Sequence, residues 1–445
     1  MSEALAQIRG ARPRRYRPYT RCKDSGVDWL GQIPVHWEVK RLKFIAPATM
    51  GKVDVKPDDA VYIGLEHVES WTGRLLLDNQ PDVVDSVVTS FKAGDVLFGK
   101  LRPYLAKAAR PDFDGVCTSE ILPLRPAARC SQSYLMYCLL SAPHIRFLDS
   151  LTYGTKMPRL SPAQIGNSFV PVPPLEEQHA VAGILDRETS RIDGLVARKE
   201  RLIELLQEKR TALITHAVTR GLDPSVQLMD SGIEWVGEIP EHWEVSRIKW
   251  VARMESGHTP DKKIEAYWRD GDVPWLSLND TGFLKDHDYI SETAHYTNEL
   301  GLRNSSARLL PAGAVVFSRD ATIGLCAITE RPIAVSQHFI AWLCGGRLLP
   351  EYLLRVFDAM QGELERLTMG ATLRTIGMPH VKELATPIPP VSEQEQIVAV
   401  IRTETAKIDA LIVKVRKAID LLKEFRTALI SAAVTGKIDV RDGVP

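Results

Sequence analysis

Two long stretches of the chain place apolar residues at the spacing of a helix that pairs with another helix. Through 389–436 the apolar side chains recur in alternating steps of four and three residues, which keeps them on one narrow face. The stretch 173–221 follows the same register with more polar interruptions. Both stretches open on prolines and close on a glycine, Gly221 or Gly436, which fits a helix stop. We therefore predict one long helix in each stretch.

The seam between these helices should contain the apolar positions of that register. At about 1.5 Å per residue, each helix would extend roughly 65 Å. Ordinary globular helices run roughly 8 to 20 residues, so this length favours pairing of the two helices over packing of each on its own domain. The predicted seam residues are Leu185, Ile192, Leu195, Leu202 and Leu206 in the first helix and Ile401, Ile408, Leu411, Val415 and Leu422 in the second.

The segment before each helix has a mixed pattern. Short runs of β-branched and aromatic residues, such as VYIGL at 61–65 and IAVSQHFIAWL at 333–343, alternate with turn residues. Each segment also contains one helix-like stretch, SYLMYCLLSAPHIRFLDSL in the first and EYLLRVFDAMQGELERL in the second. This mixture predicts an α+β domain in each half of the chain.

The two halves are copies of each other. Residues 24–46 match residues 230–252 at 14 of 23 positions, and 173–219 matches 389–435. The inserts between these blocks have diverged, yet AGDVLFGKLRP in the first and AGAVVFSRDAT in the second occupy the same place in order. Duplicated units are usually related by a twofold axis, and such an axis would make the two long helices antiparallel.

The composition is that of an ordinary folded protein. Of 445 residues, 25% are charged and 44% hydrophobic, which excludes disordered and fibrous classes. Since no apolar run approaches the roughly 18 residues of a membrane span and no signal peptide is visible, we expect a cytoplasmic protein without a membrane partner. The six cysteines are scattered without a CxxC pair, so we expect neither a metal site nor disulfides. The 56 basic residues balance 56 acidic ones, which taken alone argues against a nucleic-acid partner.

Both halves carry motifs of a known family. They begin with DSGVDWLGQIPVHWEVKRLK and DSGIEWVGEIPEHWEVSRIK, and PPLEEQ and PPVSEQ precede the long helices. The inserts contain GDVLFGKLRPYL, GHTPDKKIEAYWRDGDVPWLSLND and VVFSRDATIG. In these motifs the chain resembles the DNA specificity subunits of type I restriction-modification systems, and the resemblance covers nearly all of the chain after about residue 22.

The resemblance implies different roles for the inserts and the helices. Each insert would be a target-recognition domain that reads one half of a bipartite site in double-stranded DNA. Because the two inserts differ in sequence, the site would not be a palindrome. The helices would fix the spacing and dock two methyltransferase subunits, which methylate adenine N6 with S-adenosylmethionine. Restriction would add motor-nuclease subunits that use ATP and Mg, whereas this chain would be non-catalytic and bind no cofactor directly.

The repeat and the resemblance together predict the fold class and the domain boundaries. The fold is α+β, with two globular target-recognition domains separated by two long antiparallel helices that form a coiled coil in a pseudo-twofold repeat. The predicted parts are a basic N-terminal arm at 1–22, target-recognition domain 1 at 23–172, long helix 1 at 173–221, target-recognition domain 2 at 222–388, long helix 2 at 389–436 and a tail at 437–445. In the arm, both phosphate binding and solubilising disorder fit the run of basic residues.

Candidate DNA contacts come from the polar turns of the inserts. Lys and Arg bind phosphates, and Arg, Lys, Asn, Gln, Ser and Thr can read base edges. The stretch 91–110 has five basic residues against one acidic residue. The candidates are Lys100, Arg102, Ser119, Lys156 and Arg159 in the first insert and Lys262, Ser318, Arg319, Gln337 and Arg374 in the second. For each of them, an ordinary solvated surface residue is an equally good interpretation.

A second functional class stays open. A non-catalytic coiled-coil scaffold whose two heads bind proteins would share the long helices and the repeat. The family motifs inside the inserts and the basic stretch at 91–110 favour the DNA-reading interpretation. The tryptophans that recur in the repeated blocks, such as Trp37 and Trp243, favour packing over base stacking. The sequence contains no GxxxxGK[ST], HExxH or [DN]PP[YFW] motif that would favour an enzyme.

Overall fold

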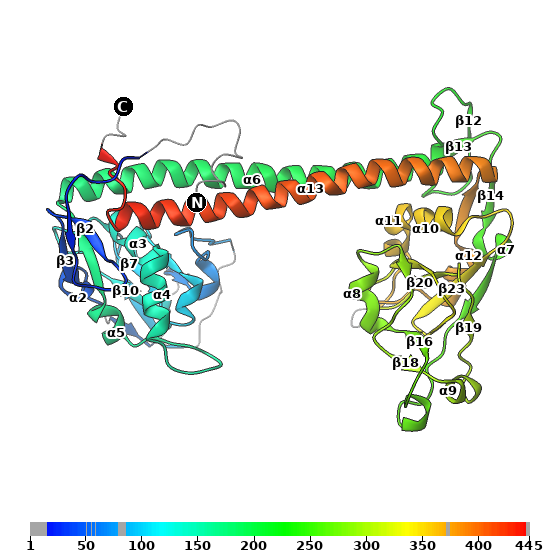
Figure 1. Cartoon of the computed structure of the whole chain (residues 1–445), viewed down its shortest axis with the longest axis horizontal. Helices are drawn as coiled ribbons and strands as arrows, with labels where there is room; N and C mark the ends of the chain where they lie inside the picture. The colour runs from blue at the N-terminus through cyan, green and yellow to red at the C-terminus, as the bar shows by residue number, and fades with distance from the viewer. Residues whose placement is uncertain are drawn as a thin grey trace. The chain divides into compact units, whose positions relative to one another are not determined.

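The computed structural model describes residues 16–49, 51–54, 56–57, 59–78, 86–370 and 374–441. It consists of two compact units, unit 1 with residues 1–200 and 415–445 and unit 2 with residues 201–414. The two long helices, α6 (Leu175–Arg220) and α13 (Val391–Val434), contribute one segment to each unit (Figure 1). Most of the predicted arm at 1–22 lies outside the described residues. Within the described part of the chain, no helix is long and apolar enough to cross a membrane.

In each half of the chain, two short antiparallel strand pairs form around the first repeated block. In unit 1, β1 (Cys22–Asp24) pairs with β2 (Gln32–Pro34), and β3 (Glu38–Arg41) pairs with β11 (Phe169–Val172). In unit 2, β12 (Leu228–Asp230) pairs with β13 (Glu238–Pro240), and β14 (Glu244–Arg247) pairs with β24 (Ala385–Ile388). Since β3 enters the first insert and β11 leaves it, this pairing brings both ends of the insert together, and β14 with β24 does the same for the second insert.

The repeated glutamate at the start of each long helix binds the histidine of the HW pair in the same unit. Glu177 Oε2 lies 2.7 Å from His36 Nε2, and Glu393 Oε1 lies 2.7 Å from His242 Nε2. In unit 2 the buried Trp243 also donates from Nε1 to the Glu393 carboxylate at 2.9 Å. These contacts explain why the HW and EQ motifs recur together, and they support packing as the role of the buried tryptophans.

The repeated glutamine one residue later holds the insert against the helix start. Gln178 Oε1 accepts the N–H of Ser131 at 2.8 Å, and Gln394 Oε1 accepts the N–H of Leu349 at 2.9 Å. Ser131 immediately precedes α3, the main helix of the first insert, and Leu349 immediately precedes α10, the main helix of the second insert. Both glutamines are buried, and the hydrogen bonds to the backbone satisfy their polar side chains.

The first insert is an α+β domain built from two sheets. A four-stranded sheet has the order β4 (Lys52–Val53), β6 (Val88–Phe91), β9 (Gly115–Thr118) and β5 (Val61–Ile63). A three-stranded sheet has the order β10 (Ile121–Leu124), β7 (Val96–Gly99) and β8 (Ala108–Ala109). The helices are α2 (Leu42–Ile45), α3 (Gln132–Leu140), α4 (Ala142–Ser150) and α5 (Pro162–Asn167), with 3₁₀ turns η1 (Leu65–His67) and η2 (Pro103–Leu105).

The core of unit 1 joins this insert to both long helices. Every residue of α3 from Tyr134 to Leu140 is buried, because α3 lies between the β7–β8–β10 sheet and the long helices (Figure 1). Side chains of α6 around Leu185 and of α13 around Ile430 belong to the same apolar cluster. The first insert is therefore packed on the helix pair and shares one core with it.

The second insert is also an α+β domain, and its two sheets have more strands than those of the first insert. One sheet has the order β15 (Ala252–Ser256), β23 (Phe339–Cys344), β20 (Val315–Ser318), β21 (Cys326–Thr329) and β17 (Tyr289–Ile290). The other has the order β18 (Tyr296–Thr297), β16 (Val273–Leu276), β22 (Ile333–Val335) and β19 (Leu309–Leu310). The helices are α7 (Ile248–Val251), α8 (Thr281–Leu284), α9 (Glu299–Arg303), α10 (Pro350–Ala359), α11 (Gln361–Arg366) and α12 (Met378–Glu383), with 3₁₀ turns η3 (Glu265–Tyr267) and η4 (Leu278–Asp280).

The long helices run antiparallel within each unit, as the repeat predicts. In unit 1, Asp193 of α6 pairs with Arg426 of α13, and Glu200 lies 3.8 Å from the Lys423 ammonium. In unit 2, Arg210 pairs with Asp409 at 3.2 Å. The predicted α+β class, the internal repeat and the antiparallel helix pair are thus all present in the structure.

The helix seam differs from the prediction at two of the ten predicted positions, Leu202 and Leu411. Leu411 and Leu202 are 43% and 40% exposed, so placing them in the seam was wrong, and Leu195 and Leu206 are only half-buried. One row of buried positions along α13 consists of Ile401, Thr405, Ile408, Ile412, Val415, Ile419, Leu422, Arg426, Leu429 and Ala433. Because Leu411 and Ile412 are both apolar, a four-three spacing alone could not choose between them. Thr405 enters the seam because its hydroxyl donates to the Ile401 carbonyl at 2.8 Å.

Candidate nucleic-acid interface

Three backbone segments of the first insert meet at the candidate surface. After β7, the N–H of Lys100 donates to the carbonyl of Glu120 at 2.8 Å, in the turn between β9 and β10. The N–H of Arg102 donates to the carbonyl of Pro158 at 2.7 Å, in the turn at 153–159. That turn is closed by a backbone bond of 3.0 Å from Arg159 to Tyr153. These bonds bring all five candidates of the first insert to one edge of the domain.

The side chains at this edge are mostly accessible. Arg102 is exposed and has a left-handed backbone conformation, with φ of 49°. Ser119 and Lys156 are exposed, and Lys100 is half-buried. The Arg159 guanidinium lies 3.1 Å from the Glu120 carboxylate, which leaves it oriented and partly neutralised. The edge can therefore offer several cationic donors to phosphates or base edges.

The second insert builds its candidate surface on a matching backbone. The N–H of Arg319 donates to the carbonyl of His338 at 3.0 Å, as Lys100 does to Glu120. The N–H of Ala321 donates to the carbonyl of Arg374 at 2.9 Å, as Arg102 does to Pro158. Ala321 also has a left-handed conformation, with φ of 62°. The two inserts thus share one hydrogen-bonded framework at this edge.

The side chains on the shared framework differ between the two inserts. Each pair of equivalent positions changes charge, size or hydrogen-bonding capacity. The pairs are Lys100 with Arg319, Leu101 with Asp320, Arg102 with Ala321, Ser119 with Gln337, Glu120 with His338 and Arg159 with Thr375. A common scaffold that presents two unlike sets of polar groups is suited to two unlike partners of one chemical class.

Comparisons with known proteins identify the family of the chain. A family model for the type I restriction modification DNA specificity domain matches residues 34–205 and 240–419, one match in each half. The chain belongs to this family. The MjaVIII specificity subunit of Methanocaldococcus jannaschii is 24% identical over 436 residues, which covers 92% of this chain and 95% of that one. The MjaIX specificity subunit of the same organism is 29% identical over 196 residues, and this match spans 44% of each chain.

Solved structures share the fold of this family member. A structure described as the basis of complex assembly and conformational transition of the type I R-M system superposes with a TM-score of 0.69 at 19% identity, covering 90% of this chain and 98% of that one. The crystal structure of the HsdS subunit from Thermoanaerobacter tengcongensis superposes with a TM-score of 0.50 at 18% identity, covering 91% and 98%. At these identities the likeness establishes the fold of the chain.

Not all of the candidate DNA contacts in the second insert are exposed. Ser318 is fully buried at the end of β20, and its hydroxyl donates to the Asp320 carbonyl at 3.1 Å, so its prediction as a DNA contact was wrong. The equivalent residue in the first insert is Gly99, also buried. Gln337 and Arg374 are exposed, whereas Arg319 is half-buried and donates from Nε to the Gln337 carbonyl at 3.3 Å.

Lys262 lies on a neighbouring loop of the second insert. Its ammonium is 5.6 Å from the ring centre of Trp275, in a cation–π contact, and the residue is exposed. The loop reaches the framework through Thr259, whose hydroxyl donates to Gln337. Lys262 is therefore connected to the other candidates through one loop contact, without belonging to the shared framework.

The basic stretch 91–110 is less cationic at the surface than its sequence indicates. Lys107 donates to the carbonyls of Leu65 and Val68 at 2.6 and 2.8 Å, and burial lowers the pKa of its ammonium. Lys92 pairs with Asp114 at 2.7 Å. Exposed apolar and aromatic side chains at the same edge, which the charge pattern did not indicate, are Tyr104, Tyr153 and Met157.

Sequence reasoning also missed the residue that organises the second surface. The Asp320 carboxylate is buried, lies 2.7 Å from His338 Nδ1 and accepts a hydrogen bond from the Thr375 hydroxyl. The Arg319 guanidinium is 3.8 Å from the same carboxylate. A single aspartate in the sequence SRDAT gives no signal of this role, because His338 and Thr375 come from distant segments.

Proposed function

We propose that the protein is the DNA specificity subunit of a type I restriction-modification complex and that each target-recognition domain reads one half of a bipartite, non-palindromic site in double-stranded DNA. The observation that carries the proposal is the shared framework with unlike side chains. Equal backbone geometry is what two domains need to approach duplex DNA in the same way, and unlike side chains are what they need to read different bases.

The candidate contacts have separable roles in this proposal. Arg102 and Lys156 are exposed cations that suit phosphates or guanine edges, and Gln337 and Arg374 can offer donors to base edges in the second domain. The ion pair with Glu120 holds the Arg159 guanidinium in one orientation at the edge of the first domain. The net charge of zero is compatible with DNA binding, because cations gathered at two edges determine the local potential there.

The long helices fix the spacing and dock two methyltransferase subunits. The support is the antiparallel pairing within each unit and the repeat itself, which offers the same helix start and the same strand pairs twice. The methyltransferase subunits supply S-adenosylmethionine-dependent methylation of adenine N6, and the motor-nuclease subunits supply restriction with ATP and Mg. The chain contributes recognition and spacing and is itself non-catalytic.

Genome-wide mapping of N6-methyladenine tests the proposal. Cells that express the methyltransferase subunits with this chain should carry modified adenines in one split motif with two unlike halves, and cells without the chain should lack that motif. A protein-binding scaffold would leave the adenine methylation pattern unchanged when the chain is deleted, and this result would reject the proposal.

A further inference from the structure

The helix pair contains two equivalent ion pairs, one in each unit. Arg426 of α13 pairs with Asp193 of α6 at 2.9 Å in unit 1. Arg210 of α6 pairs with Asp409 of α13 at 3.2 Å in unit 2. Both arginines belong to an RTALI sequence of the repeat, and both aspartates follow an isoleucine in the sequence RID or KID. The repeat thus provides each unit with the same arginine opposite the same aspartate.

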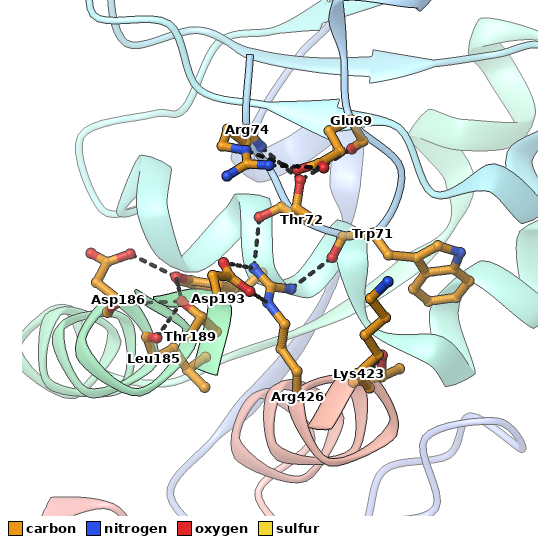
Figure 2. Close-up of polar contacts among 12 residues, drawn as sticks. Glu69, Trp71, Thr72, Arg74, Leu185, Asp186, Thr189, Asp193, Lys423 and Arg426 are labelled. Atoms are coloured by element: carbon orange, nitrogen blue, oxygen red, sulfur yellow. Dashed lines mark hydrogen bonds and ion pairs between the residues drawn. The ribbon is translucent and has the colours of Figure 1, made fainter. Parts of the chain in front are cut away.

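The two arginines differ in what covers them. The Arg426 side chain is 7% exposed and the Arg210 side chain is 34% exposed. Arg426 donates from Nη1 to the carbonyl of Trp71 at 2.7 Å and from Nη2 to the carbonyl of Thr72 at 2.8 Å (Figure 2). Among the residues that the structure describes, Asp409 is the only hydrogen-bonding partner of the Arg210 side chain. Among the described residues, only the first ion pair is therefore continued by hydrogen bonds into a target-recognition domain, whereas Arg210 has a charge interaction with Asp358 of α10.

The segment that Arg426 holds is the loop 69–74 of the first domain. Its ends are joined by a backbone bond of 3.0 Å from Glu69 to the Arg74 carbonyl and by an ion pair of 2.9 Å between their side chains. Trp71 has φ of 67°, a left-handed conformation that is costly for a large side chain and persists when its surroundings fix it. Arg426 binds the carbonyl of Trp71 itself and the carbonyl of the next residue, Thr72.

The loop 69–74 packs on the core of unit 1 through Trp71 and lies against α3 at Gly73, but its contact with the long helices is interrupted. A cavity lies between the loop, α4 and the two long helices, and its lining includes Ser70, Arg146, Val196 and Lys423. Loss of close contact across a cavity removes dispersion and burial energy. The bonds from Arg426 connect the loop directly to α13, and hydrogen bonds from a charged donor are stronger than neutral ones.

The loop in turn holds the segment that carries a candidate DNA contact. The N–H of Trp71 donates to the carbonyl of Ala106 at 3.1 Å, and the N–H of Ala106 donates to the carbonyl of Pro103 at 2.8 Å. Arg102 immediately precedes this turn, and Tyr104 lies within it. A continuous series of backbone bonds therefore connects Arg426 on α13 to the recognition edge of the first domain.

We propose that Arg426 is a positioning residue that fixes the recognition edge of target-recognition domain 1 on the helix pair through the loop 69–74. The inference deepens the proposed function and rests on it for its effect on DNA. Arg210, which bridges the helices without meeting a loop, has no such effect on domain 2. Reading of the first half-site thus depends on a residue of the second long helix, more than 300 positions away in the sequence.

Hydrogen–deuterium exchange on the full chain tests the anchor without any DNA. Arg426→Gln should accelerate exchange of the amides at 69–74 and 102–106 by about tenfold or more, while Arg210→Gln, its matched control, should leave them unchanged. Arg426→Lys keeps a positive charge near Asp193 but lacks the planar fork that reaches the carboxylate and two carbonyls together, so it should resemble Arg426→Gln. Equal exchange of these amides in the Arg426→Gln variant and the unmodified chain would overturn the proposal.

The effect on recognition is measured with the assembled methyltransferase complex. In Arg426→Gln the preference for the correct over a mismatched first half-site should fall about tenfold, and the preference at the second half-site should stay. A loosened loop with unchanged first half-site preference, or equal losses at both halves, would contradict positioning by Arg426. Asp193→Asn, which keeps an acceptor for Arg426, provides a milder variant should Arg426→Gln fold poorly, and it should shift both readouts in the same direction. If the unmodified complex reads no DNA, the proposed function fails, and loop exchange still decides whether Arg426 is the anchor.

Discussion

Arg159 and Thr375 occupy the same position in the frameworks of the two inserts, yet their side chains meet opposite surroundings. The N–H of Arg159 donates to Tyr153 at 3.0 Å and that of Thr375 to Met369 at 2.9 Å. The Arg159 guanidinium then pairs with Glu120, whereas the Thr375 hydroxyl donates to buried Asp320. One edge is held by a half-buried ion pair and the other by a buried carboxylate, which gives the two domains different chemistry on one backbone.

Arg102→Ala should weaken recognition of the first half-site without unfolding the domain. Alanine is tolerated in this left-handed conformation, because Ala321 has it at the equivalent position. We expect affinity to fall about 5- to 150-fold, equivalent to about 1–3 kcal/mol, if Arg102 contacts a base. If it contacts a phosphate, the slope of log affinity against log salt should decrease by about 1. Fluorescence anisotropy of the complex on labelled duplex across a salt series measures both.

The control for this experiment is Arg347→Ala, which removes an exposed arginine paired with Glu244 beside the long helices. It should change neither the affinity nor the salt slope. Equal behaviour of the two variants would remove Arg102 from the interface.

Asp320→Ala should destabilise unit 2 and disorder its recognition edge. The substitution leaves His338 and Thr375 without their buried acceptor, and such losses cost about 2–4 kcal/mol. For a unit of this size, the melting temperature should fall by roughly 4–16 °C. Asp320→Asn retains one acceptor oxygen, so its melting temperature should lie between those of Asp320→Ala and the unmodified chain. Calorimetry of the three chains checks the order, and an unchanged melting temperature in Asp320→Ala would show that the buried network does not support the edge.

Unit 1 should lose stability in mild acid because of His144. This side chain is fully buried, and burial lowers its pKa from 6.5 to about 4. The unfolded chain therefore binds a proton that the folded chain excludes, so the stabilisation is fully present above about pH 6.5 and is lost as the pH falls to about 4. The difference is about 3 kcal/mol, or roughly 6–12 °C in the melting temperature.

Melting curves between pH 4 and pH 7 test this prediction. His144→Leu removes the titrating group and should flatten the pH dependence of unit 1, although it also removes the contact of 3.1 Å with Ser168. His216→Gln changes an exposed histidine and should leave the pH dependence as it is. A pH profile of His144→Leu that parallels the unmodified chain would assign the acid sensitivity to other groups.

Lengthening both long helices by one heptad should widen the unspecified gap of the target. Seven residues add about 10.5 Å and preserve the alternating seam, so inserts between residues 200 and 201 and between 414 and 415 should add about 3 base pairs. Insertion of four residues at both sites changes the seam register and should abolish methylation. Methylation mapping that returns the original gap from the heptad variant would contradict a spacing role for the helices.

The large features of the fold could be predicted from the sequence because each has a local or repeated signal. The long helices follow from apolar spacing, and the antiparallel pairing follows from the repeat. The seam register did not follow, because Leu411 and Ile412 are apolar neighbours and only packing decides between them. Arg426 in the seam was also unpredicted, since its position is stable only with Asp193 and two loop carbonyls as partners.

The sequence indicated which residues could form the candidate surfaces, but it did not indicate which of their side chains are accessible. The five candidates of the first insert do lie together at one edge, yet Lys107 of the basic stretch points inward to two carbonyls and Ser318 of the second insert lies at a buried strand end. Asp320 and Tyr153 could not be recognised, because their roles depend on segments that are distant in the sequence. Residue types predict what chemistry is available, and the backbone framework decides which side chains reach the surface.

The most direct test of two separate readers is an exchange of residues 253–385 for the corresponding insert of another specificity subunit, followed by genome-wide mapping of methylated adenines. We expect the new target to keep one half and the gap of the original site and to change the other half alone. A target that changes in both halves, or in neither, would contradict the assignment of one half-site to each domain.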